Sequence, residues 1–171
     1  MIQLVLHPIK LINKWLEKAI YFLAIVIVAN MVLALTLSAL VRYVSGTGYD
    51  WFIELPPVLT SWLVFPLLGP LLKTGQHIKV DVLTIILGNK QLSFLRTLIF
   101  LISLLASVVF FVAGWEAMQL YRMLGQVMEL EIEIPIWWVY LAFPTGFFIL
   151  ALFSFELLLE EILVLIKGGN S

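Results

Sequence analysis

Four long runs of apolar residues, separated by shorter polar segments, dominate the chain. No run contains Lys, Arg, Asp or Glu, and each is close to the roughly 20 residues with which a helix crosses a bilayer core. The runs are residues 19–41, 55–72, 97–115 and 134–155. This pattern predicts a single membrane domain over residues 1–171, of the all-α integral membrane class, with four transmembrane helices.

Residues 1–18 carry a different pattern, in which apolar and basic positions alternate with the period of a helix. The apolar side holds Val5, Ile9, Ile12 and Leu16, and the basic side holds Lys10, Lys14 and Lys18. Such a segment is typical of an amphipathic helix lying in the membrane interface, where lysines meet anionic headgroups. We therefore expect an interfacial helix before the first span. A docking helix for a partner protein is the second interpretation.

The distribution of basic residues predicts how the spans are oriented. Eight of the ten basic residues fall on one side of the membrane, namely Lys10, Lys14, Lys18, Lys73, Lys79, Lys90, Arg96 and Lys167. Because short loops rich in Lys and Arg stay in the cytoplasm, both termini and the loop 73–91 are predicted to be cytoplasmic. The loop 116–133 is then periplasmic.

The composition strengthens the membrane assignment and excludes several kinds of chemistry. The chain is 63% hydrophobic and 12% charged, whereas soluble domains are about half apolar and about one-quarter charged. The net charge of −1 gives no reason to expect nucleic acid. With no Cys and only two His, little is left for a metal, haem or other cofactor. A membrane subunit that holds haem between its helices is therefore disfavoured.

The spans are poorly equipped for transport by this chain alone. Ionisable residues inside spans usually mark ion or proton paths, and the four runs contain none. Glu156 and Glu160 follow the fourth run, and we expect both carboxylates to reach the cytoplasmic interface. An autonomous oligomeric transporter or channel needs a polar path, and the support for one is limited to Asn30, Thr36, Ser38, Thr60 and Ser61.

Small and polar residues recur at helical spacing along the first and third runs. Such stripes let helices approach closely, either within one chain or against a partner subunit. The candidates for subunit packing are Asn30, Ala34, Ser38, Ser103, Ser107 and Gly114.

The most distinctive polar segment runs from Lys73 to Asp81, with the sequence KTGQHIKVD. Gly75 permits a tight turn after the second run. His77 and Asp81 lie four residues apart, but a metal site would need a third ligand, and none is near in the sequence. We interpret this segment as a structural turn.

Several such pieces occur in a fixed order that resembles one transporter family. They are Arg42, then Trp51 and Glu54, then Lys73, Gly75, His77, Ile78 and Asp81, then Ile134 with Pro135, and finally Pro144 with Gly146. With them, nearly the whole chain resembles the small membrane subunit, DctQ-like, of tripartite ATP-independent periplasmic (TRAP) transporters. Ile53 departs from the family pattern, because it stands where the first of two acidic residues is usual.

The resemblance implies a non-catalytic subunit of a sodium-driven transporter in the bacterial inner membrane. A periplasmic substrate-binding protein would deliver an organic acid, such as a C4-dicarboxylate or sialic acid, to a large permease subunit that holds the sodium coupling. This chain would scaffold the large subunit and help to form the docking surface for the binding protein. The candidates for docking are Glu129, Glu131 and Glu133.

Overall fold

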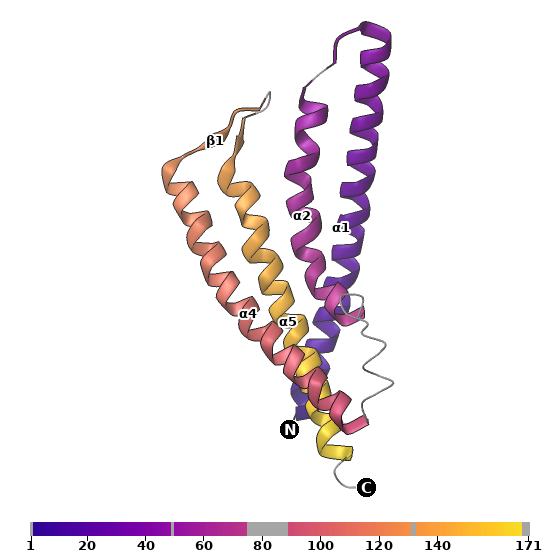
Figure 1. Cartoon of the computed structure of the whole chain (residues 1–171), viewed down its shortest axis with the longest axis vertical. Coiled ribbons are helices and arrows are strands. Elements are labelled where there is room, and N and C mark those ends of the chain that lie inside the picture. Colours follow the sequence, from indigo (N-terminus) through magenta and orange to yellow (C-terminus); the bar gives the residue numbers. More distant parts are fainter. Residues whose placement is uncertain (1, 49, 75–88, 131–132, 169–171) are drawn as a thin grey trace.

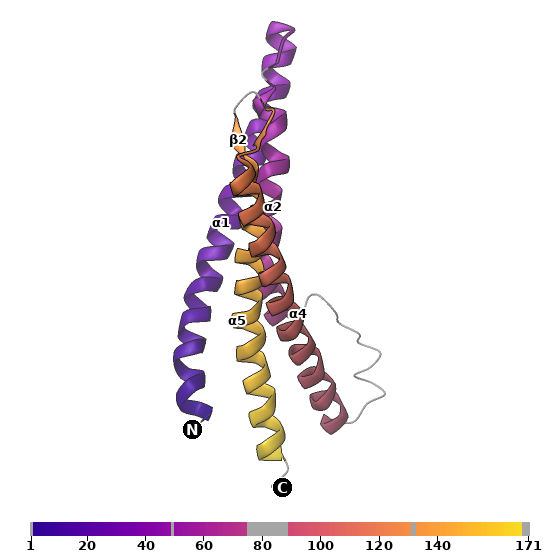
Figure 2. The same cartoon turned by 90° about the vertical axis from the view of Figure 1, so that its left-hand side faces the viewer.

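Four helices and one short hairpin make up the part of the chain that the computed structural model describes, which is residues 2–48, 50–74, 89–130 and 133–168. In chain order they are α1 (Ile2–Ser45), α2 (Trp51–Thr74), α4 (Asn89–Leu124), β1 (Val127–Met128), β2 (Ile134–Pro135) and α5 (Ile136–Gly168). In Figure 1 the pair α1–α2 and the pair α4–α5 overlap where both termini lie and are separated toward the hairpin, whereas Figure 2 shows α1, α5 and α4 spread out in that order at the end with the termini. We call these two ends of the bundle the terminal end and the hairpin end.

Three of the helices are long and apolar enough to cross a membrane. These candidate spans are Leu6–Ser45 in α1, Trp51–Thr74 in α2 and Gln91–Leu124 in α4. The prediction of an all-helical protein with several membrane spans is confirmed at this level.

The helices extend beyond the apolar runs from which they were predicted. α1 continues without a break from the expected interfacial segment into the first span, since no Gly or Pro separates the two. α4 continues to Leu124, so residues 116–124 are helical rather than part of a loop. A hairpin too short to detect from periodicity follows, in which Val127 pairs with Pro135 and Met128 with Ile134. Apolar runs mark only the hydrocarbon core, whereas a helix continues until its backbone is capped.

Local backbone chemistry accounts for where the helices end. Gly46 has φ 72°, and its N–H donates to the Arg42 carbonyl over 3.0 Å, which closes α1. Gly125 has φ 61° just after α4. Both glycines adopt the left-handed conformation that commonly terminates helices. At the start of α2, the Asp50 carbonyl accepts hydrogen bonds from the N–H groups of Ile53 and Glu54.

α5 is the central helix of the bundle. It packs against α1, α2 and α4, and near the terminal end it lies between α1 and α4 (Figure 2). Its Ala142 and Phe153 side chains are fully buried. Toward the hairpin end, four phenylalanine rings from three helices pack together with centroids 4.7–6.3 Å apart, namely Phe65, Phe110, Phe143 and Phe147.

Glycines allow the close approach of α5 to its neighbours. A Cβ on Gly146 would lie 2.5 Å from the backbone carbonyl group of Phe65 in α2. On α4, a Cβ on Gly114 would collide with the Phe143 ring of α5. Small residues at such crossings bring two backbones together and maximise van der Waals contact, which stabilises helix pairs in membranes. α2 and α4 are therefore held against α5 by positions that tolerate no side chain without a shift.

Candidate functional site

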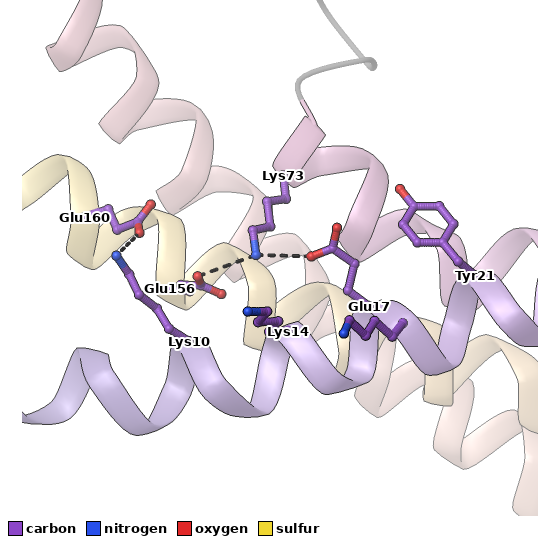
Figure 3. A pocket seen from close by; sticks show the side chains of 8 residues that line it. Lys10, Lys14, Glu17, Tyr21, Lys73, Glu156 and Glu160 are labelled. Atoms are coloured by element: carbon purple, nitrogen blue, oxygen red, sulfur yellow. Dashed lines mark hydrogen bonds and ion pairs between the residues drawn. The ribbon is translucent and has the colours of Figure 1, made fainter.

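A network of charged and polar side chains joins three helices at the terminal end. The Glu156 side chain on α5 is 3% exposed and accepts a hydrogen bond from Asn13 Nδ2 of α1 over 2.6 Å. Asn13 Nδ2 also donates to the Leu152 carbonyl, at 3.2 Å. Lys73 near the end of α2 places its Nζ 3.2 Å from Glu17 Oε2 and 3.8 Å from Glu156 Oε1 (Figure 3). We call Asn13, Glu17, Lys73 and Glu156 the terminal clamp.

Burial explains why Glu156 has these partners. A carboxylate taken out of water destabilises the fold unless a cation and hydrogen-bond donors compensate for its lost hydration. The Asn13 amide supplies the donor, and the Lys73 ammonium supplies the positive charge. The Lys73 ammonium also lies 5.7 Å from the centre of the Phe153 ring, within range of a cation–π contact. Glu156 is therefore satisfied by groups from α1 and α2 at once.

Further polar contacts surround the clamp. Lys10 of α1 forms an ion pair with Glu160 of α5, one helical turn beyond Glu156. On the other side of α5, Glu161 accepts a hydrogen bond from the Ser93 hydroxyl over 2.7 Å and lies 3.6 Å from Arg96 Nη1. Each of the three other helices is thereby tied to α5 at this end.

The polar groups of the clamp link helices to one another. Within residues 2–48, 50–74, 89–130 and 133–168, no group of three or more His, Cys, Asp or Glu side chains could hold a metal ion. The clamp carboxylates face lysine and amide groups. Since Asn13 Nδ2 and Lys73 Nζ bond to groups on other helices, this arrangement links α1, α2 and α5.

Aromatic residues gather at the opposite end of the bundle. The hydroxyl groups of Tyr121 and Tyr140 lie 3.2 Å apart, and their ring centroids are 4.2 Å apart, with the rings tilted by 32°, between α4 and α5. The Arg122 guanidinium lies 5.6 Å from the centre of the Trp137 ring. Tyrosine and tryptophan favour the membrane–water interface, where the ring is apolar and its polar tip meets water.

Comparison with known protein families identifies the family to which this chain belongs. The model of the DctQ component of tripartite ATP-independent periplasmic transporters matches residues 31–163, which is most of the chain. The chain belongs to this DctQ family. No curated protein matches it. The match includes all of α2 and α4 and most of α5, but it begins after the clamp residues of α1.

Membership of the DctQ family confirms the resemblance argued from the motifs. The chain is a component of a transporter and has no enzymatic role. Its several candidate spans agree with the membrane location of TRAP components in bacteria.

The motif residues of this DctQ chain have varied surroundings. Arg42 lies at the end of α1, with its guanidinium against Gly48, and Trp51 begins α2 with its ring stacked on Phe52 at 4.0 Å. Glu54 lies in the first turn of α2. Pro144 is fully buried beside Gly114. The predicted turn residues Gly75, His77, Ile78 and Asp81 lie outside the described residues.

The packing candidates divide into buried and exposed positions. Ala34, Ser38, Ser107 and Gly114 are buried within the chain, and Ser103 is half-buried. The Ser107 hydroxyl donates to the Leu104 carbonyl of its own helix, at 2.7 Å, so its hydrogen is used within α4. Asn30 is exposed, and any close packing that it makes is with another molecule.

Two members of the terminal clamp differ from what the sequence suggested. The expectation that the Glu156 carboxylate reaches the interface is wrong, because the residue is only 2% exposed. Asn13 was counted on neither face of the N-terminal helix, yet it is fully buried. Their partnership spans 143 residues of sequence, and no spacing pattern in the sequence indicated it.

Proposed function

We propose that this chain is a non-catalytic scaffold for the large permease subunit of a TRAP transporter. The observation that carries the proposal is the extent of apolar surface that the chain leaves uncovered. Apart from prolines, only nine hydrophobic side chains are buried among the described residues, whereas large apolar residues are exposed along most of α1 and α4. Contiguous apolar surface on this scale requires lipid, a partner, or both.

The positions of the two uncovered helices support a scaffold. α1 and α4 lie at opposite edges of the bundle, and α5 lies between them near the terminal end (Figure 2). On α1 the exposed residues include Phe22, Ile25 and Leu33, and on α4 they include Ile102 and Val109. A bundle with an apolar face at each edge can cover part of a larger membrane protein while still facing lipid.

The same proposal includes four spans with both termini in the cytoplasm of the inner membrane. α5 is taken as the fourth span, because residues 136–155 contain no Lys, Arg, Asp or Glu and α5 packs beside all three candidate spans. The terminal end, with its lysines, then lies at the cytoplasmic face, as the positive-inside rule requires. The aromatic residues of the hairpin end lie at the periplasmic face.

The hairpin end is then available to the substrate-binding protein. Glu129 and Glu133 are exposed beside β1 and β2, and Glu131 lies outside the described residues. Acidic groups at the rim of an interface steer a partner that carries a basic patch and mainly change the association rate. The transported molecule is an organic acid such as a C4-dicarboxylate or sialic acid, and the sodium coupling belongs to the large subunit.

The test is sodium-driven uptake into proteoliposomes assembled from purified parts. We expect uptake only when the large subunit, the binding protein and this chain are all present. Vesicles that contain this chain alone are the control, and we expect no flux from them. Uptake that is undiminished without this chain would contradict the scaffold. Flux through this chain alone would favour the autonomous oligomeric transporter or channel instead.

A further inference from the structure

Four lysines and three glutamates line a cavity of about 520 Å³ at the terminal end, beside the clamp. The lysines are Lys10, Lys14, Lys18 and Lys73, and the glutamates are Glu17, Glu156 and Glu160. Lys73 serves Glu17 and Glu156, and Lys10 pairs with Glu160 (Figure 3). All three carboxylates therefore already have cations.

Lys14 and Lys18 are the remaining charges of the cavity. Neither has an ion-pair partner in the part of the chain that the structure describes, and both side chains are exposed. They lie four residues apart on α1, so they occupy one face of the helix. The Lys18 ammonium lies 5.6 Å from the centre of the Trp15 ring, which is 69% exposed. Two unpaired ammonium groups on one helix face offer positive charge and hydrogen-bond donors to an anionic group.

The helix face that carries these lysines continues as an apolar surface. Phe22 and Ile25 follow Lys18 at helical spacing, and they are 71% and 67% exposed. With a rise of 1.5 Å per residue, Ile25 lies about 10 Å deeper along α1 than Lys18. A molecule with a phosphate at the lysines and a hydrocarbon chain along Phe22 and Ile25 matches both parts of this surface.

We propose that Lys14 and Lys18 bind the phosphate of one anionic phospholipid, whose acyl chain lies along Phe22 and Ile25. A free phosphate would use the lysines but not the apolar surface below them. The cavity has four cations and three anions, so one phosphodiester neutralises it. The lipid would fill the space beside the terminal clamp and cover part of the exposed face of α1.

The test measures lipid binding to the full-length chain, purified in detergent, by native mass spectrometry. The probes are phosphatidylglycerol, which is anionic, and phosphatidylcholine, which is zwitterionic. Since each lysine near a lipid surface contributes about a fivefold preference for anionic lipid, we expect phosphatidylglycerol to bind at least about tenfold more tightly to the wild-type chain. The double variant Lys14→Gln with Lys18→Gln should bind the two lipids nearly equally.

Two matched variants separate this site from general attraction by positive charge. Lys14→Arg with Lys18→Arg keeps both charges and should keep the preference. Arg122→Gln removes an exposed cation at the hairpin end and should also keep the preference for phosphatidylglycerol. An unchanged preference in the double Gln variant would overturn the proposal. Displacement of the lipid by an equal concentration of inorganic phosphate would also overturn it, because the site would then recognise a free anion.

This site rests on the proposed function in one respect, since only the predicted topology places it in the cytoplasmic leaflet. The lipid measurement uses the chain alone and needs neither the large subunit nor transport. A failed lipid preference would leave the scaffold proposal intact. Conversely, uptake that did not need this chain would leave the lipid site intact.

Discussion

Replacing Gly146 with Ala tests how tightly α2 and α5 are packed. The added methyl carbon would lie 2.5 Å from Cβ, the carbonyl carbon and the carbonyl oxygen of Phe65, whereas ordinary contacts begin near 3.4 Å. The two helices must therefore separate locally by about 1 Å. The backbone atoms of Phe65 cannot turn aside as the end of a flexible side chain can. The same movement would loosen the Phe65–Phe143 ring contact, whose centroids are 4.9 Å apart.

Two opposing effects set how much Gly146→Ala changes the free energy of unfolding. Forcing extra carbon into a packed core typically destabilises a protein by about 1–3 kcal/mol. Ala stabilises a helix by about 1 kcal/mol relative to Gly. Because the obstructing atoms are backbone, we expect a net loss of about 1–2 kcal/mol in the free energy of unfolding. Gly114→Ala should be milder, since the Phe143 ring can rotate.

The assay is unfolding of the purified chain by increasing fractions of sodium dodecyl sulfate, followed by tryptophan fluorescence and circular dichroism. Ala113→Gly is the control, because Ala113 is exposed on α4 and reports the Gly–Ala difference without a helix contact. Gly146→Ala should unfold at a lower detergent fraction than the wild-type chain. Unfolding at the same or a higher fraction would refute the close packing of α2 against α5.

Three further predictions concern the clamp, the topology and the hairpin end. Asn13→Leu should destabilise the chain by about 1–3 kcal/mol, because it leaves the buried Glu156 carboxylate without its hydrogen-bond donor. In a double-mutant cycle, adding Glu156→Leu should restore part of that lost stability, and purely additive effects would contradict the clamp. Reporter fusions after Ile86 and at the C-terminus should read cytoplasmic, and fusions near Gly48 and Met128 periplasmic; a periplasmic signal at Ile86 would invert the topology. Changing Glu129, Glu131 and Glu133 together to Lys should slow uptake when the binding protein is scarce, and abundant binding protein should rescue it; unchanged uptake at limiting binding protein would remove these residues from the docking surface.

The helices could be predicted from the sequence because membrane insertion imposes a simple rule. A charge-free run long enough to span lipid must form a helix, since its backbone has no water to bond. The rule says little about where helices end in water, so it could not predict that α4 extends past residue 115 to Leu124. Gly146 could be singled out as part of a motif, but its contact with the Phe65 backbone depends on how α2 and α5 cross.

The terminal clamp could not be predicted in the same way. Glu156 follows the fourth apolar run, and a carboxylate there usually reaches water. Its burial depends on Asn13 and Lys73, which lie 143 and 83 positions earlier in the chain. Only the contact of α1, α2 and α5 at one end brings these three groups together. Long-range pairing of this kind leaves no periodic pattern in a single sequence.

Photocrosslinking from the exposed apolar faces tests the scaffold claim most directly. A photoreactive phenylalanine analogue would be placed at Val32 or Leu33 on α1 and at Ile102 or Val109 on α4, all of which are exposed. The complex would be illuminated in native membranes that contain the large subunit and the binding protein. If the chain is a scaffold, at least one of the two faces crosslinks to the large subunit, while the buried position Ala142 does not. Crosslinks from both faces only to other copies of this chain would contradict the scaffold claim.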